Sequence, residues 1–256
     1  MKKVCVYTYS YLPSMEGGPL YSNKQIDKIT KTGYNVVVIS RRRKYEKNCL
    51  IGYNNVKVKK IKSLYFKWTK YNHIVDRFFT YNLSVIETIS IECKDAELLH
   101  ILPHSIFFPV GYLTKKRYNI PIVTSIIEDF WAKPQNDFLT SLFFKYQKWQ
   151  VKIALKHSDI VTIPNEIGLE HIEKKFPQYR EKLRLIPGFI ETNVFNPFIE
   201  VPNSLRKKYE DYKIIFVPQR LVQTKGVDIA IKALKQVLQH MKKSSNIIML
   251  IAEVVR

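Results

Sequence analysis

The sequence predicts an α/β protein in which strands of a parallel sheet alternate with helices. Short runs of apolar residues, such as 36–39, are separated by longer segments in which apolar residues recur at helical spacing. A run that is apolar throughout is typical of a strand buried on both faces of a parallel sheet. Residues 4–39 form a strand, a helix and a second strand, but they lack the GxGxxG fingerprint of dinucleotide-binding proteins. We therefore expect a Rossmann-like sheet without that fingerprint.

Glycine, proline and asparagine residues help to mark where the expected elements begin and end. Strands are expected at residues 4–8, 36–39, 97–102, 118–127, 159–164, 183–186, 213–216 and 246–251, and the last two are expected to be buried. Gly33 suits the left-handed position that follows the first helix, and Asn165 suits the N-cap of another helix. Expected core contacts on helix 71–92 are Ile74, Phe78, Leu83, Ile86, Ile89 and Ile91. Those on helix 138–155 are Phe138, Leu142, Phe143, Tyr146, Trp149 and Ile153.

Composition limits the class of protein without choosing a function. The chain of 256 residues is long for one domain, and its 46% hydrophobic content argues against disorder. The net charge of +20 favours phosphate-bearing partners of any kind, including nucleic acid, anionic lipid and nucleotide-sugars. Cys5, Cys49 and Cys93 form neither a CxxC pair nor a metal-ligand spacing with the histidines, which fits a reducing cytosol. No segment has the roughly 18 apolar residues needed to span a bilayer.

A mixture of basic and aromatic residues covers residues 41–71. This composition suits nucleic acid or an anionic membrane surface. The simpler interpretation is an exposed loop and an edge strand kept soluble by lysine. We expect no nucleic-acid binding, and peripheral contact with an anionic membrane stays open.

Two loops have features that suit phosphate groups. Gly17 and Gly18 follow the first strand, and residues without a Cβ allow a backbone to approach a ligand closely. Arg220 follows an apolar strand and Lys225 is expected to open the next helix, so two cations flank a helix N-terminus. That end carries partial positive charge and free N–H groups, which suits a diphosphate. The alternatives are a plain turn at the glycines and a surface loop with two solvated bases.

Residues 220–228, RLVQTKGVD, resemble the donor-phosphate loop of the family 4 glycosyltransferases, which have the GT-B fold. Residues 187–197 resemble the interdomain segment of that family, with Glu191 where the family has Asp. The sequence departs from the family pattern at Gln219, where a glycine is usual, and at Gly188, where an asparagine is usual.

The resemblance implies roles for particular residues. Arg220 and Lys225 hold the diphosphate of a nucleotide-sugar donor, and the family's glycine-rich loop corresponds to Gly17 and Gly18. The candidate catalytic residues are Glu128 and Asp129, with Glu128 standing where the family has a histidine that contacts the donor sugar. The candidate substrate contacts are His100 and Asn165. No metal ligand and no cofactor are expected.

The resemblance also implies a domain organisation. Residues 1–187 form a Rossmann-like N-terminal, acceptor-side domain, residues 188–205 an interdomain linker, and residues 206–256 the beginning of a second, nucleotide-sugar-binding Rossmann-like domain. The family continues through further strand-helix units, so we expect a truncated C-terminal domain, and the activity of this chain stays open.

The implied reaction is retaining transfer of a hexose from a nucleotide-diphosphate-sugar to a hydroxyl of a glycan or lipid-linked acceptor, in cell-surface polysaccharide biosynthesis. The expected location is the cytoplasm, and peripheral contact at the inner face of the membrane stays open. The alternative is a non-catalytic basic protein that docks on an anionic membrane or polyanion. An epimerase of similar two-domain shape is disfavoured because the two matching segments fit transferases better.

Overall fold

The computed structural model describes residues 2–12, 17–42, 55–63, 80–102, 107–126, 138–188, 190–240 and 246–252, with backbone alone at 17–19, 138–140, 143 and 224. The chain divides into two compact units, Met1–Phe189 and Ile190–Arg256.

The first unit is built on a seven-stranded sheet of order β3-β2-β1-β4-β5-β6-β7. Every neighbouring pair is parallel. The strands are β1 (Lys3–Thr8), β2 (Asn35–Arg42), β3 (Val56–Lys62), β4 (Leu98–Ile101), β5 (Ile122–Ser125), β6 (Ile160–Ile163) and β7 (Leu183–Leu185). This sheet confirms the predicted Rossmann-like α/β class.

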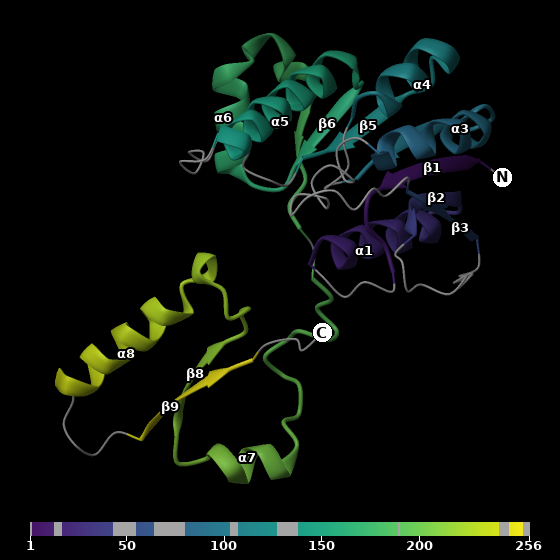
Figure 1. Cartoon of the computed structure of the whole chain (residues 1–256). Helices are drawn as coiled ribbons and strands as arrows, with labels where there is room; N and C mark the ends of the chain where they lie inside the picture. Colours follow the sequence, from purple (N-terminus) through teal and green to yellow (C-terminus); the bar gives the residue numbers. More distant parts are fainter. Residues whose placement is uncertain are drawn as a thin grey trace. The chain divides into compact units, whose positions relative to one another are not determined.

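Helices cover both faces of this sheet (Figure 1). They are α1 (Gly17–Lys31), α3 (Tyr81–Cys93), α4 (Val110–Tyr118), α5 (Phe138–His157) and α6 (Glu166–Lys175), followed by the 3₁₀ helix η2 (Pro177–Lys182). α1 lies on one face, and α3, α4, α5 and α6 lie on the other. Because alternate residues of a strand point to opposite faces, the sheet supplies two cores. Val6 and Val38 pack with Ile26 of α1, while Tyr7 and Ile39 pack with Tyr81 of α3.

The α3 and α5 faces differ from those expected from apolar spacing. Leu83 and Ile91 are 60% and 62% exposed, because the inward side of α3 carries Val85, Ile89 and the ion-paired Glu92. Leu142 and Trp149 of α5 are likewise exposed. The inward side of α5 includes two buried glutamines, Gln147 and Gln150, besides its apolar residues. Ile74 and Phe78 lie outside the described residues, and the side chains of Phe138 and Phe143 are not described.

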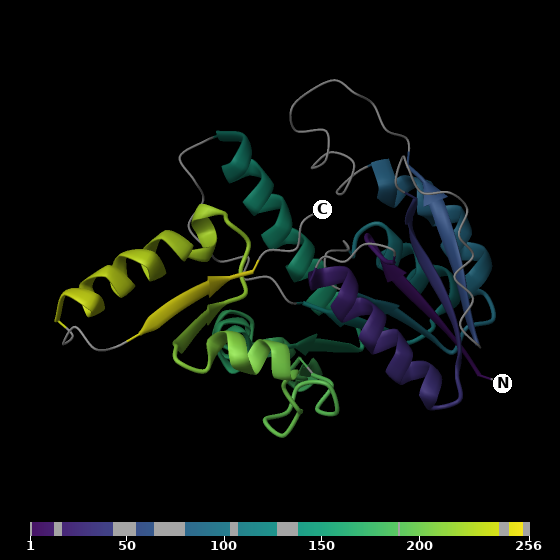
Figure 2. The same cartoon turned by 90° about the horizontal axis from the view of Figure 1, so that it is seen from below.

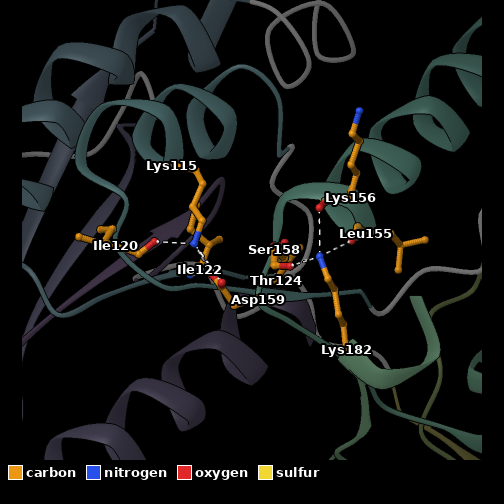
Figure 3. Close-up of polar contacts among 9 residues, drawn as sticks. All are labelled: Lys115, Ile120, Ile122, Thr124, Leu155, Lys156, Ser158, Asp159 and Lys182. Carbon is orange, nitrogen blue, oxygen red and sulfur yellow. Dashed lines mark hydrogen bonds and ion pairs between the residues drawn. The ribbon is translucent and has the colours of Figure 1, made fainter. Parts of the chain in front are cut away.

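A lysine from the η2 helix closes the end of α5 (Figure 3). The Nζ of Lys182 donates to the carbonyl oxygens of Leu155, Lys156 and Ser158 at 3.3, 3.0 and 2.9 Å. The last carbonyls of a helix have no partner within the helix, and a cation there also matches the helix dipole. Lys182 therefore fixes the connection from α5 to β6.

A second lysine fixes the starts of β5 and β6. Lys115 donates to both carboxylate oxygens of Asp159 at 2.9 and 2.8 Å, and Asp159 also accepts from the backbone N–H of Ile122 at 2.8 Å. Burial would raise the pKa of Asp159, but the hydrogen bonds from Lys115 and Ile122 outweigh it and lower that pKa. These contacts hold the amino ends of β5 and β6 together (Figure 3).

The second unit contains α7 (Asn203–Tyr209), β8 (Lys213–Val217), the 3₁₀ turn η3 (Gln223–Lys225), α8 (Val227–His240) and β9 (Ile247–Ile251). β8 and β9 pair in parallel, with α8 running beside them (Figure 2). The strands form as predicted, but the expectation that they are buried is wrong. Ile215 and Phe216 are 39% and 61% exposed. The physical reason is that the described part of this unit supplies two strands and one main helix, too few layers to cover both sheet faces.

Candidate functional site

The carboxyl edge of the first sheet has a topological switch point between β1 and β4. These strands are neighbours, yet the chain leaves β1 toward α1 on one face and leaves β4 toward α4 on the other (Figure 1). In open α/β sheets, ligands bind outside the carboxyl ends of the strands at such a point. This edge is therefore the candidate site of the first unit.

Gly17 and Gly18 are the first two residues of α1, which follows β1. The first turn of α1 carries no acidic residue. Because the first N–H groups of a helix have no partner within it, this end suits an anion. The structure thus places the predicted glycines at a helix N-terminus beside the switch point. Residues 13–16, which precede them, lie outside the described part of the chain.

His100 belongs to a chain of hydrogen bonds across three strands. Its Nε2 lies 2.8 Å from the Oγ of Ser125, and the hydroxyl of Thr162 donates to the same Oγ at 2.7 Å. When Thr162 donates to Ser125 and Ser125 donates onward, Nε2 is an acceptor and the imidazole proton resides on Nδ1. Ser125 and Thr162 were missed by sequence reasoning. Their one signal is that each is a polar residue near the carboxyl end of a strand that begins with two apolar residues.

The environment of His100 keeps its ring neutral. The residue is half-buried in the sheet, and loss of hydration lowers its pKa from 6.5 to about 4. A neutral imidazole with its proton on Nδ1 donates a hydrogen bond without carrying charge. The arrangement therefore suits contact with a hydroxyl or carbonyl oxygen better than general-base catalysis near pH 7.

Replacement of His100 with glutamine is expected to flatten the pH dependence of stability. Between pH 6.5 and 4 the unfolded chain binds a proton at His100 that the folded chain does not, so the free energy of unfolding falls as pH falls. The variant loses a slope of up to about 1.4 kcal/mol per pH unit in that window. Urea unfolding at several pH values measures it, with His171→Gln on the exposed side of α6 as control. An unchanged slope in His100→Gln contradicts the assignment.

Two further hydroxyls are buried on the α1 side of the sheet. Ser22 of α1 and Ser40 at the carboxyl end of β2 are 1% and 0% exposed. Neither Oγ has a hydrogen-bond partner within the described part of the chain. Ser40 pairs in register with Thr8, the last residue of β1. Buried polar atoms of this kind are normally satisfied by a hydrogen bond.

Asn165 caps α6, as the sequence predicts. Its side-chain oxygen accepts a hydrogen bond from the backbone N–H of Gly168 at 2.7 Å. The residue is exposed and lies two positions beyond the end of β6. Its side-chain amide N–H groups are left to face solvent or a ligand at the carboxyl edge, and a substrate contact there stays a prediction.

The candidate catalytic residues Glu128 and Asp129 lie outside the described residues, as does most of the basic and aromatic stretch at 41–71. Where that stretch is described, several of its cations contact the protein itself. The guanidinium of Arg41 lies 5.3 Å from the ring centre of Tyr9, and Lys60 donates to the carbonyl of Leu12 at 2.6 Å.

In the second unit, Arg220 and Lys225 lie on the turn between β8 and α8. Both are exposed. Lys225 belongs to η3 and does not open α8 as expected, because Gly226 follows it at φ +64°, a left-handed conformation that ends the turn before α8 begins at Val227. The backbone N–H of Lys225 donates to the carbonyl of Val222 at 2.9 Å, which holds the loop compact.

The described residues contain neither a metal-binding cluster nor a membrane-spanning helix. Within these ranges, no group of three or more His, Cys, Asp or Glu side chains is placed to hold a metal ion. No helix in the described part of the chain is long and apolar enough to cross a membrane.

Several solved structures resemble this fold, although no protein-family model and no curated protein matches the sequence. Sucrose-phosphate synthase from Thermosynechococcus elongatus superposes with a TM-score of 0.68 at 12% identity, over 97% of this chain and 62% of that chain. The catalytic domain of starch synthase IV from Arabidopsis thaliana, bound to ADP and acarbose, gives 0.64 at 14% identity, over 98% and 68%. Os79 from O. sativa, in complex with UDP, gives 0.52 at 9% identity, over 86% and 60%.

At these identities the likeness establishes the fold alone. The chain has an α/β, Rossmann-like architecture of the kind found in GT-B glycosyltransferases, as the sequence predicts. It spans 62% of the length of the sucrose-phosphate synthase.

Proposed function

We propose that this chain is a retaining glycosyltransferase of the family 4 type, which moves a hexose from a nucleotide-diphosphate-sugar to a hydroxyl group. The observation that carries the proposal is the pair of exposed cations, Arg220 and Lys225, on the turn that precedes the N-terminus of α8. A diphosphate bound there is neutralised by both side chains and by the helix N-terminus. The GT-B likeness supports the same class of reaction.

The proposed roles follow the charge that develops during transfer. As the sugar leaves, negative charge grows on the diphosphate, and Arg220 and Lys225 stabilise it where it forms. Gly17 and Gly18, at the N-terminus of α1, are proposed to offer backbone N–H donors to phosphate oxygens. His100 donates from Nδ1 to a substrate oxygen, and Asn165 donates from its amide. Glu128 and Asp129, which lie outside the described residues, are proposed to act on the sugar or on the acceptor hydroxyl.

The proposed acceptor is a glycan or a lipid-linked hydroxyl, and the proposed location is the cytoplasm with peripheral contact at the inner face of the membrane. Neither an obligatory metal nor a cofactor enters the proposal, because two cationic side chains and a helix end can perform the charge neutralisation.

Nucleoside diphosphates are expected to raise the melting temperature of the protein. A ligand at 100 times its Kd stabilises the native state by about 2.7 kcal/mol. Thermal unfolding is measured with UDP, GDP and ADP at physiological salt, and with uridine as a control without phosphate. The double variant Arg220→Ala, Lys225→Ala is expected to bind the best nucleotide at least about 100-fold more weakly, since each charge-assisted contact contributes about 1.5–3 kcal/mol.

Arg206→Ala with Lys207→Ala removes the same charge from the exposed side of α7 and serves as the matched control. If both double variants lose nucleotide binding equally, the assignment of Arg220 and Lys225 is wrong. No response to any nucleotide, together with binding to vesicles or polyanions that weakens steeply with salt, favours the non-catalytic alternative.

A further inference from the structure

The outward side of α5 is a continuous stripe of apolar and basic residues. Among the α5 residues whose side chains are described, the exposed ones are Leu142, Lys145, Trp149, Lys152 and Lys156. Their spacing of three and four residues places them along one side of the helix. Leu142 and Trp149 are 55% and 41% exposed, although a buried position is usual for both residue types.

The neighbouring helix α4 continues this stripe. Its exposed residues are Leu113, Lys116 and Arg117. α4 and α5 lie on the same side of the sheet (Figure 1). Neither helix contains an aspartate or glutamate. We call the eight exposed residues the α4–α5 surface. Acidic side chains occur on both flanking helices, Glu87 on α3 and Glu166, Glu170 and Glu173 on α6, so the surface has defined limits.

The exposed indole of this surface is held by packing beneath it. The ring of Trp149 makes an edge contact with Phe108 at 5.2 Å between centroids and lies 5.7 Å from Tyr146. Gln150 accepts from the backbone N–H of Phe108 at 2.8 Å and donates to the hydroxyl of Tyr146 at 2.7 Å. These contacts fix the aromatic residues that support Trp149, so its exposed part is presented at low conformational cost.

We propose that the α4–α5 surface docks on an anionic lipid bilayer. The basic side chains match the negative surface of such a membrane, and the Trp149 indole is suited to the boundary between headgroups and acyl chains. Nucleic acid is the weaker match, because exposed leucines at 113 and 142 have no role in phosphate contact but gain from insertion into lipid. Lys115 is excluded from the surface because it pairs with Asp159.

This docking surface extends the peripheral membrane contact proposed above, and it gives that contact a location. The transferase carrying it would meet a lipid-linked acceptor at the bilayer itself. Vesicle binding is measured without nucleotide or acceptor, so docking and glycosyl transfer can each fail while the other stands.

The test is binding of the full chain to vesicles of phosphatidylcholine mixed with phosphatidylglycerol, compared with vesicles of phosphatidylcholine alone. Co-sedimentation is expected with the anionic vesicles and not with the neutral ones. The triple variant Lys145→Gln, Lys152→Gln, Lys156→Gln is expected to bind about 100-fold more weakly, since each cation near an anionic surface contributes about fivefold. Equal melting temperatures for wild type and variant show that the fold is kept.

The matched control replaces Lys28, Lys174 and Lys207 with glutamine, one exposed lysine from each of α1, α6 and α7. It loses the same charge and is expected to bind vesicles as the wild type does. An equal loss in both triple variants assigns the binding to net charge and overturns the proposal. The proposal is also overturned if the variant Lys145→Gln, Lys152→Gln, Lys156→Gln loses binding to single-stranded RNA while its vesicle binding is unchanged.

Insertion is tested through the indole itself. In a protein with Trp68→Phe and Trp131→Phe, Trp149 is the remaining tryptophan. Its fluorescence is expected to shift to shorter wavelength and to be quenched by brominated acyl chains when anionic vesicles are added. Bound protein whose Trp149 emission neither shifts nor is quenched contradicts docking through this surface.

Discussion

Replacing Glu92 with alanine is expected to lower the free energy of unfolding by about 3 kcal/mol. The Glu92 side chain is 8% exposed, and Lys3 Nζ lies 3.3 Å from one of its carboxylate oxygens. Lys59 pairs with the other oxygen. Lys3 and Lys59 are themselves half-buried, with side-chain exposures of 20% and 32%. Removing the carboxylate therefore leaves two half-buried ammonium groups of like charge without their shared partner, although Lys3 keeps a second carboxylate contact, to Asp95 at 2.6 Å. Urea unfolding measures the loss.

The same carboxylate should make the protein sensitive to acid. Burial would raise the pKa of Glu92, but hydrogen bonds from Lys59 and Lys3 outweigh it and hold the pKa below the ordinary 4.5. A lowered carboxylate pKa adds stability above pH 4.5, and that stability is lost as pH falls through the folded pKa. The free energy of unfolding of Glu92→Ala is therefore expected to fall less than that of the wild type as the pH is lowered.

Glu87→Ala, on the exposed side of the same helix, is the control and should change the free energy of unfolding by less than about 0.5 kcal/mol. If Glu92→Ala is as mild as Glu87→Ala, the buried ion pairs contribute little to stability. That outcome would mean that apolar contacts, and not these ion pairs, stabilise this end of the sheet.

Elements defined by local chemistry could be predicted from the sequence. The run at 36–39 is apolar because β2 is covered on both faces, and the strand forms where expected. Gly33 has the predicted left-handed φ of +87°, and Asn165 caps α6 as predicted. Each of these signals depends on a residue and its immediate neighbours, so no knowledge of the tertiary fold is needed.

The side of a helix that faces the sheet could not be predicted from local sequence. The apolar spacing of α3 placed Leu83 in the core, but Glu92 lies on the inward side of the helix. Its burial depends on lysines from β1 and β3. In α5, buried Gln150 is held by Phe108, which lies 42 residues away in sequence. Burial of polar residues depends on such distant partners, and an apolar pattern contains no information about them.

The candidate site residues also differ in whether the sequence reveals them. The glycines at α1 and the cations before α8 can be recognised because they follow a predicted strand and precede a predicted helix. The partners of His100 do not stand out, since Ser125 and Thr162 come from two other strands and meet it through the pairing of β4, β5 and β6. That pairing is a property of the sheet and not of any one segment.

Replacing Tyr81 with alanine is expected to lower the free energy of unfolding by about 3–5 kcal/mol, as for other buried aromatic residues. Tyr81 is 0% exposed, and its ring lies 5.8 Å from that of Tyr7 and 5.4 Å from that of Tyr9. Its hydroxyl donates to the carbonyl of Thr8 at 3.2 Å, at the carboxyl end of β1. The residue therefore joins α3 to the strand end from which the candidate site begins.

Tyr81→Phe separates the hydroxyl from the ring. It keeps the packing and loses the hydrogen bond to Thr8, so it should lower the free energy of unfolding by about 1 kcal/mol in urea unfolding. Leu83→Ala, on the same helix at a position that is 60% exposed, should change it by less than about 0.5 kcal/mol. The loss of stability is therefore expected to decrease in the order Tyr81→Ala, Tyr81→Phe, Leu83→Ala. If Leu83→Ala is as damaging as Tyr81→Ala, then α3 packs on the sheet through the face that apolar spacing suggested, and the contact between α3 and β1 described above is wrong.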